Sequence, residues 1–411
     1  MAVQLVTVSA SLLQGEGTDE AAQAVARLCL SRGLPIVGRQ IVGEDEAEIE
    51  AALRLGLERG ELLIIFSGSG GSAGEPVRRA LSRVLGARLV LNEKILQALQ
   101  THYARQEQMM PRRLERLALV PQGAVLLLGA AGEPGFFVET DSVTVALLPV
   151  EPEPAMELAA QHLLPLIQGR FASRATTLVR TVKVVGLDIG EVEERLGNWL
   201  AGRPDCSVLC LAQLGEVWVR IAARGASAGL TEATLAEVET LLRERLGADY
   251  YGRDQETLEG VVGRLLSEHG LTLAVAESCT GGLIGHRLTE VSGSSRYFER
   301  GLVTYSNAAK TELLGVSKTI LARHGAVSAE CASAMAQGVR SRAKSDLGVA
   351  VTGIAGPEGG SEEKPVGTVF FALAAADGVK GERRRFRGTR AQNKWLAAQF
   401  ALDLVRRHLL A

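Results

Sequence analysis

Residues 271–282 read LTLAVAESCTGG, an apolar run that ends in a glutamate, a serine, a cysteine, a threonine and two glycines. Leu271 to Ala276 has the length and composition of a buried strand, and a helix is predicted to begin near Gly282. A buried strand followed at once by a turn and a helix is the unit from which α/β domains are built. The stretch therefore predicts an α/β domain in which Ser278 lies between a strand and a helix.

The same pattern continues on both sides of this stretch, from Thr257 to the end of the chain. A helix is predicted from Leu258 to His269, because apolar residues recur there at helical spacing. Since strands and helices alternate after it, residues 256–411 are expected to form one α/β domain. Its further strands are predicted at Gly301–Tyr305, Leu347–Val351 and Gly367–Ala374.

An α/β pattern also covers residues 1–168, the first predicted domain. Its third strand, Leu62–Phe66, is followed by a glycine-rich turn from Ser67 to Gly74 and by a helix from Pro76. Open α/β sheets bind ligands at the carboxyl ends of such strands. The other predicted elements are strands Leu5–Val8 and Ile36–Val42, helices Glu20–Arg32 and Glu44–Gly60, and, after the proline-rich Leu148–Pro154, a helix that ends near Ile167.

A smaller predicted domain, residues 172–252, follows a break near Gln168–Arg170 and has the order β-α-β-β-α. It carries no acidic pair with a histidine, no phosphate loop and no exposed aromatic pair of the kind that stacks on bases. A packing or linker domain is therefore favoured over an RNA-binding one. The strands are predicted at Ala175–Val185, Ser207–Gln213 and Val217–Ala222, and the helices at Ile189–Leu200 and Thr231–Leu246.

The composition is that of a folded multidomain protein. At roughly 150 residues per domain, 411 residues suggest two or three domains. Hydrophobic residues make up 46 % and charged residues 22 %, which excludes a disordered, collagenous or coiled-coil chain. The start lacks a signal peptide and no apolar run approaches the ~20 residues that span a bilayer. We therefore expect a cytoplasmic protein with no membrane contact.

The five cysteines are odd in number and scattered, which fits a reducing compartment and buried free thiols. Cys206 and Cys210 lie close, but a single Cys-x3-Cys without a nearby histidine is a poor zinc signal.

The net charge of −2 is unevenly distributed: from Glu256 onward there are 20 basic and 15 acidic residues, against 25 and 32 before it. The mild excess of basic residues after Glu256 favours an anionic ligand. The alternative is that surface charge differs between the domains without a functional reason. The basic region has too few aromatic residues among its lysines and arginines to indicate nucleic-acid binding.

The turn that contains Ser278 is the first candidate for chemistry. Backbone N–H groups there, with the helix N-terminus, could stabilise an oxyanion or hold a phosphate. Gly281 and Gly282 would let a ligand approach the backbone closely. The alternative is a tight strand-to-helix turn capped by Ser278 or Thr280.

A second candidate is GLVTYSNAAK, residues 301–310, which brings Tyr305 to a strand end and Lys310 to the first turn of a helix. A positive charge in the first turn of a helix interacts unfavourably with the helix dipole, which suggests that Lys310 has a function there. A serine needs a base, and neither His286 nor His324 has surroundings that recommend it. A desolvated lysine can be that base. The alternative is a solvated helix residue.

A third candidate is AVTGIAGPEGGS, residues 350–361, a glycine-rich turn after an apolar strand. Thr352 could bind the nucleophile, the base or a substrate carbonyl. Alternatively, the glycines only make a long loop.

Taken together, AESCTGG, GLVTYSNAAK, AVSAE and VTGIAGPEGG resemble the C-terminal domain of the CinA family (competence/damage-inducible protein A), the nicotinamide mononucleotide deamidases of the PncC type. The resemblance covers Glu256 to Leu410. It implies a hydrolase that converts the carboxamide of nicotinamide mononucleotide into nicotinic acid mononucleotide and ammonia, in pyridine nucleotide salvage. No metal or cofactor is implied for that step.

The resemblance implies that Ser278 is the nucleophile, that Lys310 and Tyr305 assist its deprotonation and the proton relay, and that Thr352 completes the polar site. Cys279 is a rival nucleophile, but it is expected to point into the new helix. The implied substrate-binding residues are Glu277, Thr280, Gly281, Gly282, Asn307, Gly353, Ala355, Gly356, Arg390 and Lys394.

The phosphate is expected at the stretch from Gly388 to Lys394. Lys394 stands where the family commonly has an arginine. The phosphate would therefore be held by a lysine ammonium, which is a point charge, and not by the forked donors of a guanidinium. The run Arg383–Arg385 could contribute, or it could be a solvated strand face.

The remainder of the chain also resembles the CinA family, whose N-terminal domain is a molybdopterin-binding-like α/β sandwich with metal-dependent ADP-ribose pyrophosphatase activity in some members. Here the family's Gly-Thr-Glu-Leu-Leu is Ser9-Ala-Ser-Leu-Leu13, and its Leu-Pro-Gly-x-Pro loop survives only as Leu148 to Pro152. Its Gly-Gly-Leu-Gly-Pro-Thr-x-Asp-Asp loop is GSGGSAGEP, so Glu75 and Pro76 replace the paired aspartates that hold a hard cation. We therefore expect a degenerate domain that is kept for assembly and takes no divalent metal. The middle module matches the family's linker domain.

Two other functions stay open at this point. One is a non-enzymatic interaction protein linked to competence or DNA damage, for which Ser278 would not matter. The other is an ADP-ribose pyrophosphatase in the N-terminal domain, which the missing aspartates disfavour. The expected partners are a mononucleotide substrate and a second copy of the chain in a homodimer, without direct nucleic-acid binding.

Overall fold

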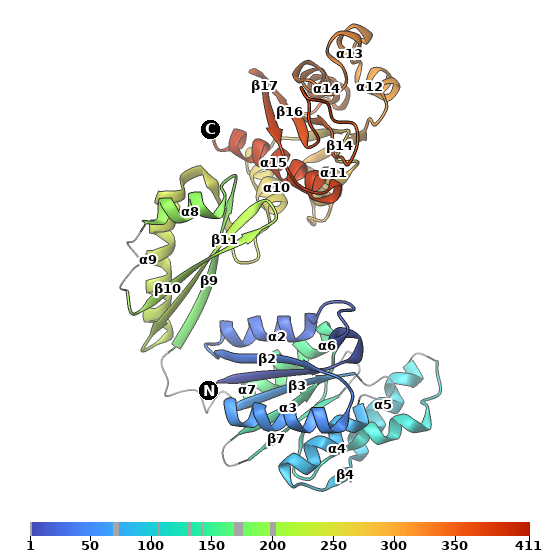
Figure 1. Cartoon of the computed structure of the whole chain (residues 1–411), viewed down its shortest axis with the longest axis vertical. Helices are drawn as coiled ribbons and strands as arrows, with labels where there is room; N and C mark the ends of the chain where they lie inside the picture. The colour runs from blue at the N-terminus through green and yellow to red at the C-terminus, as the bar shows by residue number, and fades with distance from the viewer. Residues whose placement is uncertain are drawn as a thin grey trace. The chain divides into compact units, whose positions relative to one another are not determined.

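The computed structural model describes residues 2–68, 74–105, 107–129, 134–140, 143–167, 176–197 and 203–411. These residues form three α/β domains, and each is described by itself (Figure 1). Within the described residues, no helix is both long enough and apolar enough to cross a bilayer.

The N-terminal domain is a six-stranded sheet with helices on both faces (Figure 1). All residues of the central strands β1 and β3 are buried, as expected for parallel strands that are covered on both sides. One face packs on α2, α6 and α7, and the other on α3, α4 and α5. The strand order is β2-β1-β3-β8-β7-β6, with β1 Val3–Val8, β2 Ile36–Val42, β3 Leu62–Ser67, β6 Val125–Leu127, β7 Gly135–Glu139 and β8 Thr144–Leu148. The helices are α1 Ala10–Leu13, α2 Glu20–Ser31, α3 Glu46–Arg59, α4 Gly74–Leu85, α5 Glu93–Arg105, η1 Arg112–Ala118, α6 Pro152–Glu157, the π-helical η2 Leu158–Leu163 and α7 Leu164–Ile167; β4 Leu89–Leu91 pairs with β5 Leu119–Pro121.

The predicted elements of this domain are present, with two differences at proline residues. Helix α4 begins at Gly74, two residues before Pro76, and Pro152 is the first residue of α6 rather than part of an interruption. Both differences follow from the tolerance of proline in the first turn of a helix. The expected break near Gln168–Arg170 and most of the glycine-rich turn, residues 69–73, lie outside the described residues.

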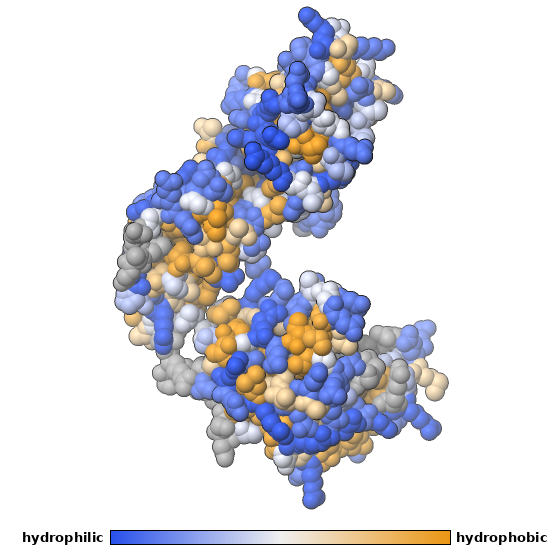
Figure 2. Space-filling model, viewed as in Figure 1, coloured by the Kyte–Doolittle hydropathy of each residue, from blue (hydrophilic) through white to orange (hydrophobic). Residues whose placement is uncertain are grey.

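The middle domain has the predicted β-α-β-β-α order and one further strand, β12, which pairs with β9. Every second residue of β11 from Val217 to Ala223 is buried, so one face of the sheet packs against the helices. Apolar side chains also gather on the surface over these strands (Figure 2), where Leu209 is 55 % exposed. The elements are β9 Thr176–Val185, α8 Ile189–Leu196, β10 Cys206–Gln213, β11 Glu216–Gly225, α9 Ala228–Leu246, η5 Gly247–Asp249 and β12 Tyr250–Arg253.

The C-terminal domain is a five-stranded sheet of the order β14-β13-β15-β16-β17. Strand β13 runs parallel to β14 and β15, while β16 and β17 are antiparallel. Helices α10, α11 and α15 pack on one face of the sheet, and α14 packs on the other. The elements are α10 Leu258–His269, β13 Leu273–Glu277, α11 Leu283–Thr289, η6 Ser294–Arg296, β14 Phe298–Val303, α12 Asn307–Leu314, α13 Lys318–His324, α14 Ala329–Ala343, β15 Leu347–Gly353, β16 Thr368–Ala375, β17 Gly378–Arg385 and α15 Arg390–Leu409.

This topology brings the three candidate motifs to one edge of the sheet. The parallel strands β13, β14 and β15 are neighbours, so their carboxyl ends meet. Ser278 and Thr304 follow β13 and β14, and Thr352 is the last residue but one of β15. The run Arg383–Arg385 ends β17 and is exposed on the strand, and its part in phosphate binding stays a prediction.

Candidate functional site

Ser278 and Lys310 are in hydrogen-bond contact although they lie 32 positions apart. The Ser278 backbone N–H donates to the Val351 carbonyl (3.0 Å), which fixes the turn after β13 against β15. The Lys310 Nζ donates to Ser278 Oγ (3.0 Å) and to the Thr304 carbonyl (2.6 Å). The candidate nucleophile and the candidate base therefore face each other, and a backbone carbonyl orients the amine.

Lys310 is only 1 % exposed and forms no ion pair with any described carboxylate. Burial lowers the pKa of its amine, because the charged form loses its hydration. A lysine with a lowered pKa has a larger neutral fraction near neutral pH, and only the neutral amine can accept a proton from a serine.

The rival nucleophile Cys279 is buried, and burial raises the pKa of its thiol to about 12. Since the thiolate is the reactive form of cysteine, Cys279 stays protonated and unreactive at neutral pH. Ser278 is therefore the better nucleophile of the two neighbours.

Glu277 caps helix α11. Its carboxylate accepts hydrogen bonds from the backbone N–H groups of Gly282 (2.9 Å), Ile284 (3.2 Å) and Gly285 (2.9 Å), and the residue is 1 % exposed. Its oxygens satisfy N–H groups at the start of the helix, and its part in substrate binding stays a prediction.

The same contacts change where an oxyanion could be held. The first N–H groups of α11 already have an acceptor, so they are not free for a ligand. The N–H groups of Cys279 and Thr280, by contrast, donate to no oxygen among the described residues, although both interact with the Cys279 sulfur. Cys279 lines the cavity with Ser278, so these amides are the candidate oxyanion donors.

A cavity of about 290 Å³ opens in front of the Ser278–Lys310 pair. Thr352 lies in its wall, and its hydroxyl donates to the Ala326 carbonyl (2.7 Å), so its lone pairs remain available as acceptors. The lining residues are Ser278, Cys279, Tyr305, Lys310, Ala326, Val327, Thr352, Gly353, Ile354, Ala355, Gly356, Glu358, Gly359 and Arg390.

Arg390, the first residue of α15, supplies the positive charge of this cavity. Its guanidinium donates to the Gly356 carbonyl (2.8 Å) and to the Tyr305 hydroxyl (2.9 Å), which are both neutral. Arg390 forms no ion pair with a described carboxylate, although Glu358 lines the same cavity. Tyr305 is 62 % exposed and contacts Arg390 rather than Ser278 or Lys310, so its part in the proton relay stays a prediction.

Several expected binding residues lie outside the cavity lining. Thr280 is fully buried and its hydroxyl has no hydrogen-bond partner among the described residues, so its part in substrate binding stays a prediction. Asn307 lines a separate hollow with Lys318 and Leu321. The ammonium of Lys394 lies beside Gly281, 3.5 Å from the position that a Cβ would occupy there. Gly281 and Gly282 have positive φ angles of 63° and 96°, which explains the two glycines by the turn itself.

The structure adds residues that sequence reasoning missed. The Thr304 carbonyl could not be found from side-chain motifs, because it acts through its backbone. Glu358 and Asn393 lie within the motifs at residues 350–361 and 388–394, but no pattern in the sequence distinguishes them from their neighbours. The other additions are Ala326, Val327, Ile354 and Gly359.

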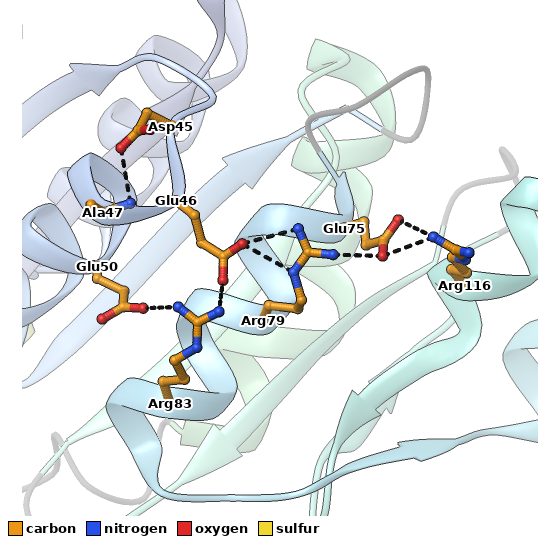
Figure 3. A network of polar contacts seen from close by, with 8 residues as sticks. All are labelled: Asp45, Glu46, Ala47, Glu50, Glu75, Arg79, Arg83 and Arg116. Atoms are coloured by element: carbon orange, nitrogen blue, oxygen red, sulfur yellow. Dashed lines mark hydrogen bonds and ion pairs between the residues drawn. The ribbon is translucent and has the colours of Figure 1, made fainter.

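In the N-terminal domain, Glu75 is held by arginines (Figure 3). Its carboxylate accepts from Arg79 (2.7 Å) and from Arg116 (2.9 and 3.0 Å). Arg79 and Arg83 also contact Glu46, which extends the network to α3 (Figure 3). The acid that replaces the paired aspartates is thus neutralised by neighbouring cations.

A larger cavity of about 790 Å³ lies between α15, β17 and the β10–β11 hairpin. Its arginines are paired: Arg195 and Arg407 both contact Asp249 (2.5 Å). Among the described residues, its lining holds no serine, threonine, cysteine, lysine or histidine, so it offers no hydroxyl or thiol nucleophile and no lysine or histidine base.

Comparison with known proteins covers almost the whole chain. Residues 255–409 match the family described as "CinA C-terminal domain", residues 4–169 match "Probable molybdopterin binding domain", and residues 179–252 match "Damage-inducible protein CinA KH domain".

Similar proteins carry the same family name. A CinA-like protein of Geobacter metallireducens is 40 % identical over 413 residues, covering 100 % of both chains. A CinA-like protein of Syntrophotalea carbinolica is 39 % identical, covering 99 % of this chain and 98 % of its own. The crystal structure of the competence/damage inducible protein CihA from Agrobacterium tumefaciens is 42 % identical and covers 38 % of this chain and 94 % of its own, with a TM-score of 0.37. The chain therefore belongs to the CinA family.

Proposed function

We propose that this chain is an amidase that hydrolyses the carboxamide of nicotinamide mononucleotide to nicotinic acid mononucleotide and ammonia. The observation that carries the proposal is the 3.0 Å contact between Lys310 Nζ and Ser278 Oγ, in surroundings that lower the pKa of the lysine. An amide requires a strong nucleophile, and a serine paired with a neutral lysine provides one without a histidine.

In the first half of the reaction, neutral Lys310 accepts the hydroxyl proton of Ser278 while Oγ attacks the carboxamide carbon. The carbonyl oxygen becomes an oxyanion, for which the N–H groups of Cys279 and Thr280 are the candidate donors. The tetrahedral intermediate then collapses: the C–N bond breaks, the lysine ammonium returns its proton to the departing nitrogen, and ammonia leaves. Ser278 is left as an acyl ester.

In the second half, water replaces ammonia. Neutral Lys310 takes a proton from the water, the hydroxide oxygen attacks the ester carbon, and the oxyanion occupies the same place. Collapse breaks the bond to Oγ, Ser278 recovers its proton from Lys310, and the carboxylate product dissociates. The Thr304 carbonyl keeps the amine aimed at Oγ through both halves, because its hydrogen bond needs only one N–H of the amine.

The substrate class is supported by the charge of the cavity and by the family resemblance. Arg390 offers a guanidinium that forms no ion pair with a described carboxylate, at the end of the cavity that the Gly356 turn and Tyr305 form. A phosphate is the anion that such a fork binds well. Lys394 lies beside Gly281, outside the cavity lining, and its part in phosphate binding stays a prediction.

The experiment that tests the proposal measures ammonia release from nicotinamide mononucleotide, in the presence of EDTA. We expect Ser278→Ala and Lys310→Met to lose activity by at least about a thousandfold, in line with the loss of a nucleophile or its base. Cys279→Ala is the matched control at the neighbouring position and is expected to keep its activity. A folded wild type that releases no ammonia would support the interaction-protein alternative instead.

We further propose that the protein acts in the cytoplasm as a homodimer, and that its amidase step needs no metal. Light scattering checks the assembly: a particle near 43.6 kDa, the mass of one chain, would contradict the dimer.

A further inference from the structure

Asn393 is a buried amide whose hydrogen bonds all go to the backbone around the cavity. It lies one turn into α15 and is 1 % exposed. Its Nδ2 donates to the carbonyls of Ala355 and Gly388 (both 3.0 Å), and its Oδ1 accepts from the Gly388 N–H (2.9 Å). The side chain thus joins the turn after β15 to the segment that leads into α15.

The neighbouring contact of Arg390 continues this junction. Positions 390 and 393 lie three apart on one helix face, and they hold two consecutive carbonyls, those of Gly356 and Ala355. Up to Ile354 the same turn is tied to the sheet by backbone bonds, Ile354 N–H to Thr368 and Gly367 N–H to Ile354. Beyond Ile354, the two carbonyls are held by α15 side chains.

We propose that Asn393 is a positioning residue that sets where the Arg390 guanidinium meets the phosphate of the substrate. This inference rests on the proposed amidase function. Asn393 touches no reacting atom: it acts by fixing the first turn of α15 to the 353–356 turn, so that Arg390 can hold Gly356 and Tyr305 and still present its charge to the cavity.

The Ser278–Lys310 pair does not depend on this junction. Ser278 is held by β15, and Lys310 is oriented by the Thr304 carbonyl, so neither contact involves α15. Loss of Asn393 is therefore expected to weaken binding of the phosphate and to leave the chemical step nearly unchanged. A variant that raises KM and keeps kcat has lost binding energy that acts equally on the ground state and the transition state.

The test compares Asn393→Leu, nearly equal in volume, with Gln399→Leu as the matched control. Gln399 is on the same helix and 2 % exposed, but its amide donates to Glu216 of the middle domain (2.8 Å) rather than to the cavity. Both variants lose a buried amide, so both lower the melting temperature. Asn393→Ser, which keeps a hydroxyl in a smaller side chain, is a second variant in case the leucine prevents folding.

We expect Asn393→Leu to raise KM for nicotinamide mononucleotide roughly tenfold, as befits a weakened guanidinium–phosphate contact. Its kcat is expected to stay within about twofold, and kcat/KM for nicotinamide riboside, which lacks the phosphate, is expected not to change. Calorimetry should show the same weakening for the product, nicotinic acid mononucleotide. Gln399→Leu should leave all of these values at those of the wild type.

The inference is overturned by a folded Asn393→Leu with unchanged KM and product affinity, or by equal losses for the substrates with and without phosphate. If the wild type binds the product but releases no ammonia, the amidase proposal fails alone, and the product affinities of the variants still decide the role of Asn393. If the wild type binds no mononucleotide, both proposals fail.

Discussion

Lys310 is the residue whose titration the proposed reaction depends on. Its side chain is buried beside Ser278 Oγ and the Thr304 carbonyl, and burial lowers its pKa. The amine must be neutral to accept the serine proton, so kcat/KM should rise tenfold per pH unit on the acid side. It should level off above the lowered pKa of Lys310, below the ordinary value of about 10.4. A profile that is flat from pH 6 to pH 10 would contradict this role.

The same pKa shift has a consequence for stability. At pH values below 10.4 the unfolded chain carries the lysine proton, whereas the folded chain must bury that charge or release the proton. This penalty is present at neutral pH and disappears as the pH rises through the unfolded pKa. Lys310→Met should therefore be inactive yet melt at or above the wild-type temperature at pH 7. The gap between the two should narrow towards pH 10 in thermal scans. A variant that melts well below the wild type at pH 7 would show that the hydrogen bonds of Lys310 outweigh its desolvation.

At the scale of the element, Glu277 determines how β13 passes into α11. Its carboxylate satisfies three N–H groups at the start of the helix. Glu277→Gln replaces one acceptor oxygen by an NH₂ group that faces these donors, so the free energy of unfolding should fall by about 1–3 kcal/mol. Denaturant-induced unfolding measures this change in the free energy of unfolding.

The matched control for this change is Glu290→Gln at the other end of α11. Glu290 is exposed and lies 4.0 Å from His286, so its replacement should change stability by less than about 0.5 kcal/mol. Equal effects of the two substitutions would show that Glu277 does not hold the helix start.

The elements themselves were largely predictable where local signals agree. Helix α10 runs from Leu258 to His269 as expected, because Thr257 caps its first turn and Gly270 ends it in the left-handed region. Strand β17 was missed, since its sequence GVKGERRR is polar and pairs with the sheet only along β16. Strand β12 was missed because four residues carry too little periodicity.

The site was predictable only in part, for a related reason. A serine and a lysine near strand ends are visible in the sequence, and the parallel order of β13 and β14 makes them meet. The capping role of Glu277 was missed, because a carboxylate beside a candidate nucleophile looks the same in the sequence whether it faces a ligand or a helix start. Asn393 was missed because its partners, Ala355 and Gly388, come together only in the folded domain.

At the scale of the whole molecule, the middle domain matches a KH family but lacks that family's nucleic-acid clamp. KH domains hold nucleotides with a Gly-x-x-Gly loop. No two glycines between residues 176 and 253 have that spacing. We expect the dissociation constant for single-stranded RNA or DNA to lie above about 100 μM at physiological salt, as measured by fluorescence anisotropy. Tight, salt-dependent binding would contradict the packing role.

The N-terminal domain is expected to be inactive as a pyrophosphatase. Glu75 is paired with Arg79 and Arg116, so its carboxylate is not free to hold a hard cation (Figure 3). ADP-ribose should stay intact with Mg²⁺, Mn²⁺ or Co²⁺, as followed by chromatography. Cleavage that Glu75→Ala abolishes would overturn this expectation.

The central claim is that Ser278, activated by Lys310, forms a covalent bond to the acyl group of the substrate. Mass spectrometry of the protein after acid quenching during turnover of nicotinamide mononucleotide tests it most directly. The account predicts an acyl adduct on the peptide that contains Ser278, absent from Ser278→Ala and present in Cys279→Ala. Ammonia release by Ser278→Ala at the wild-type rate, with no adduct in either protein, would contradict it.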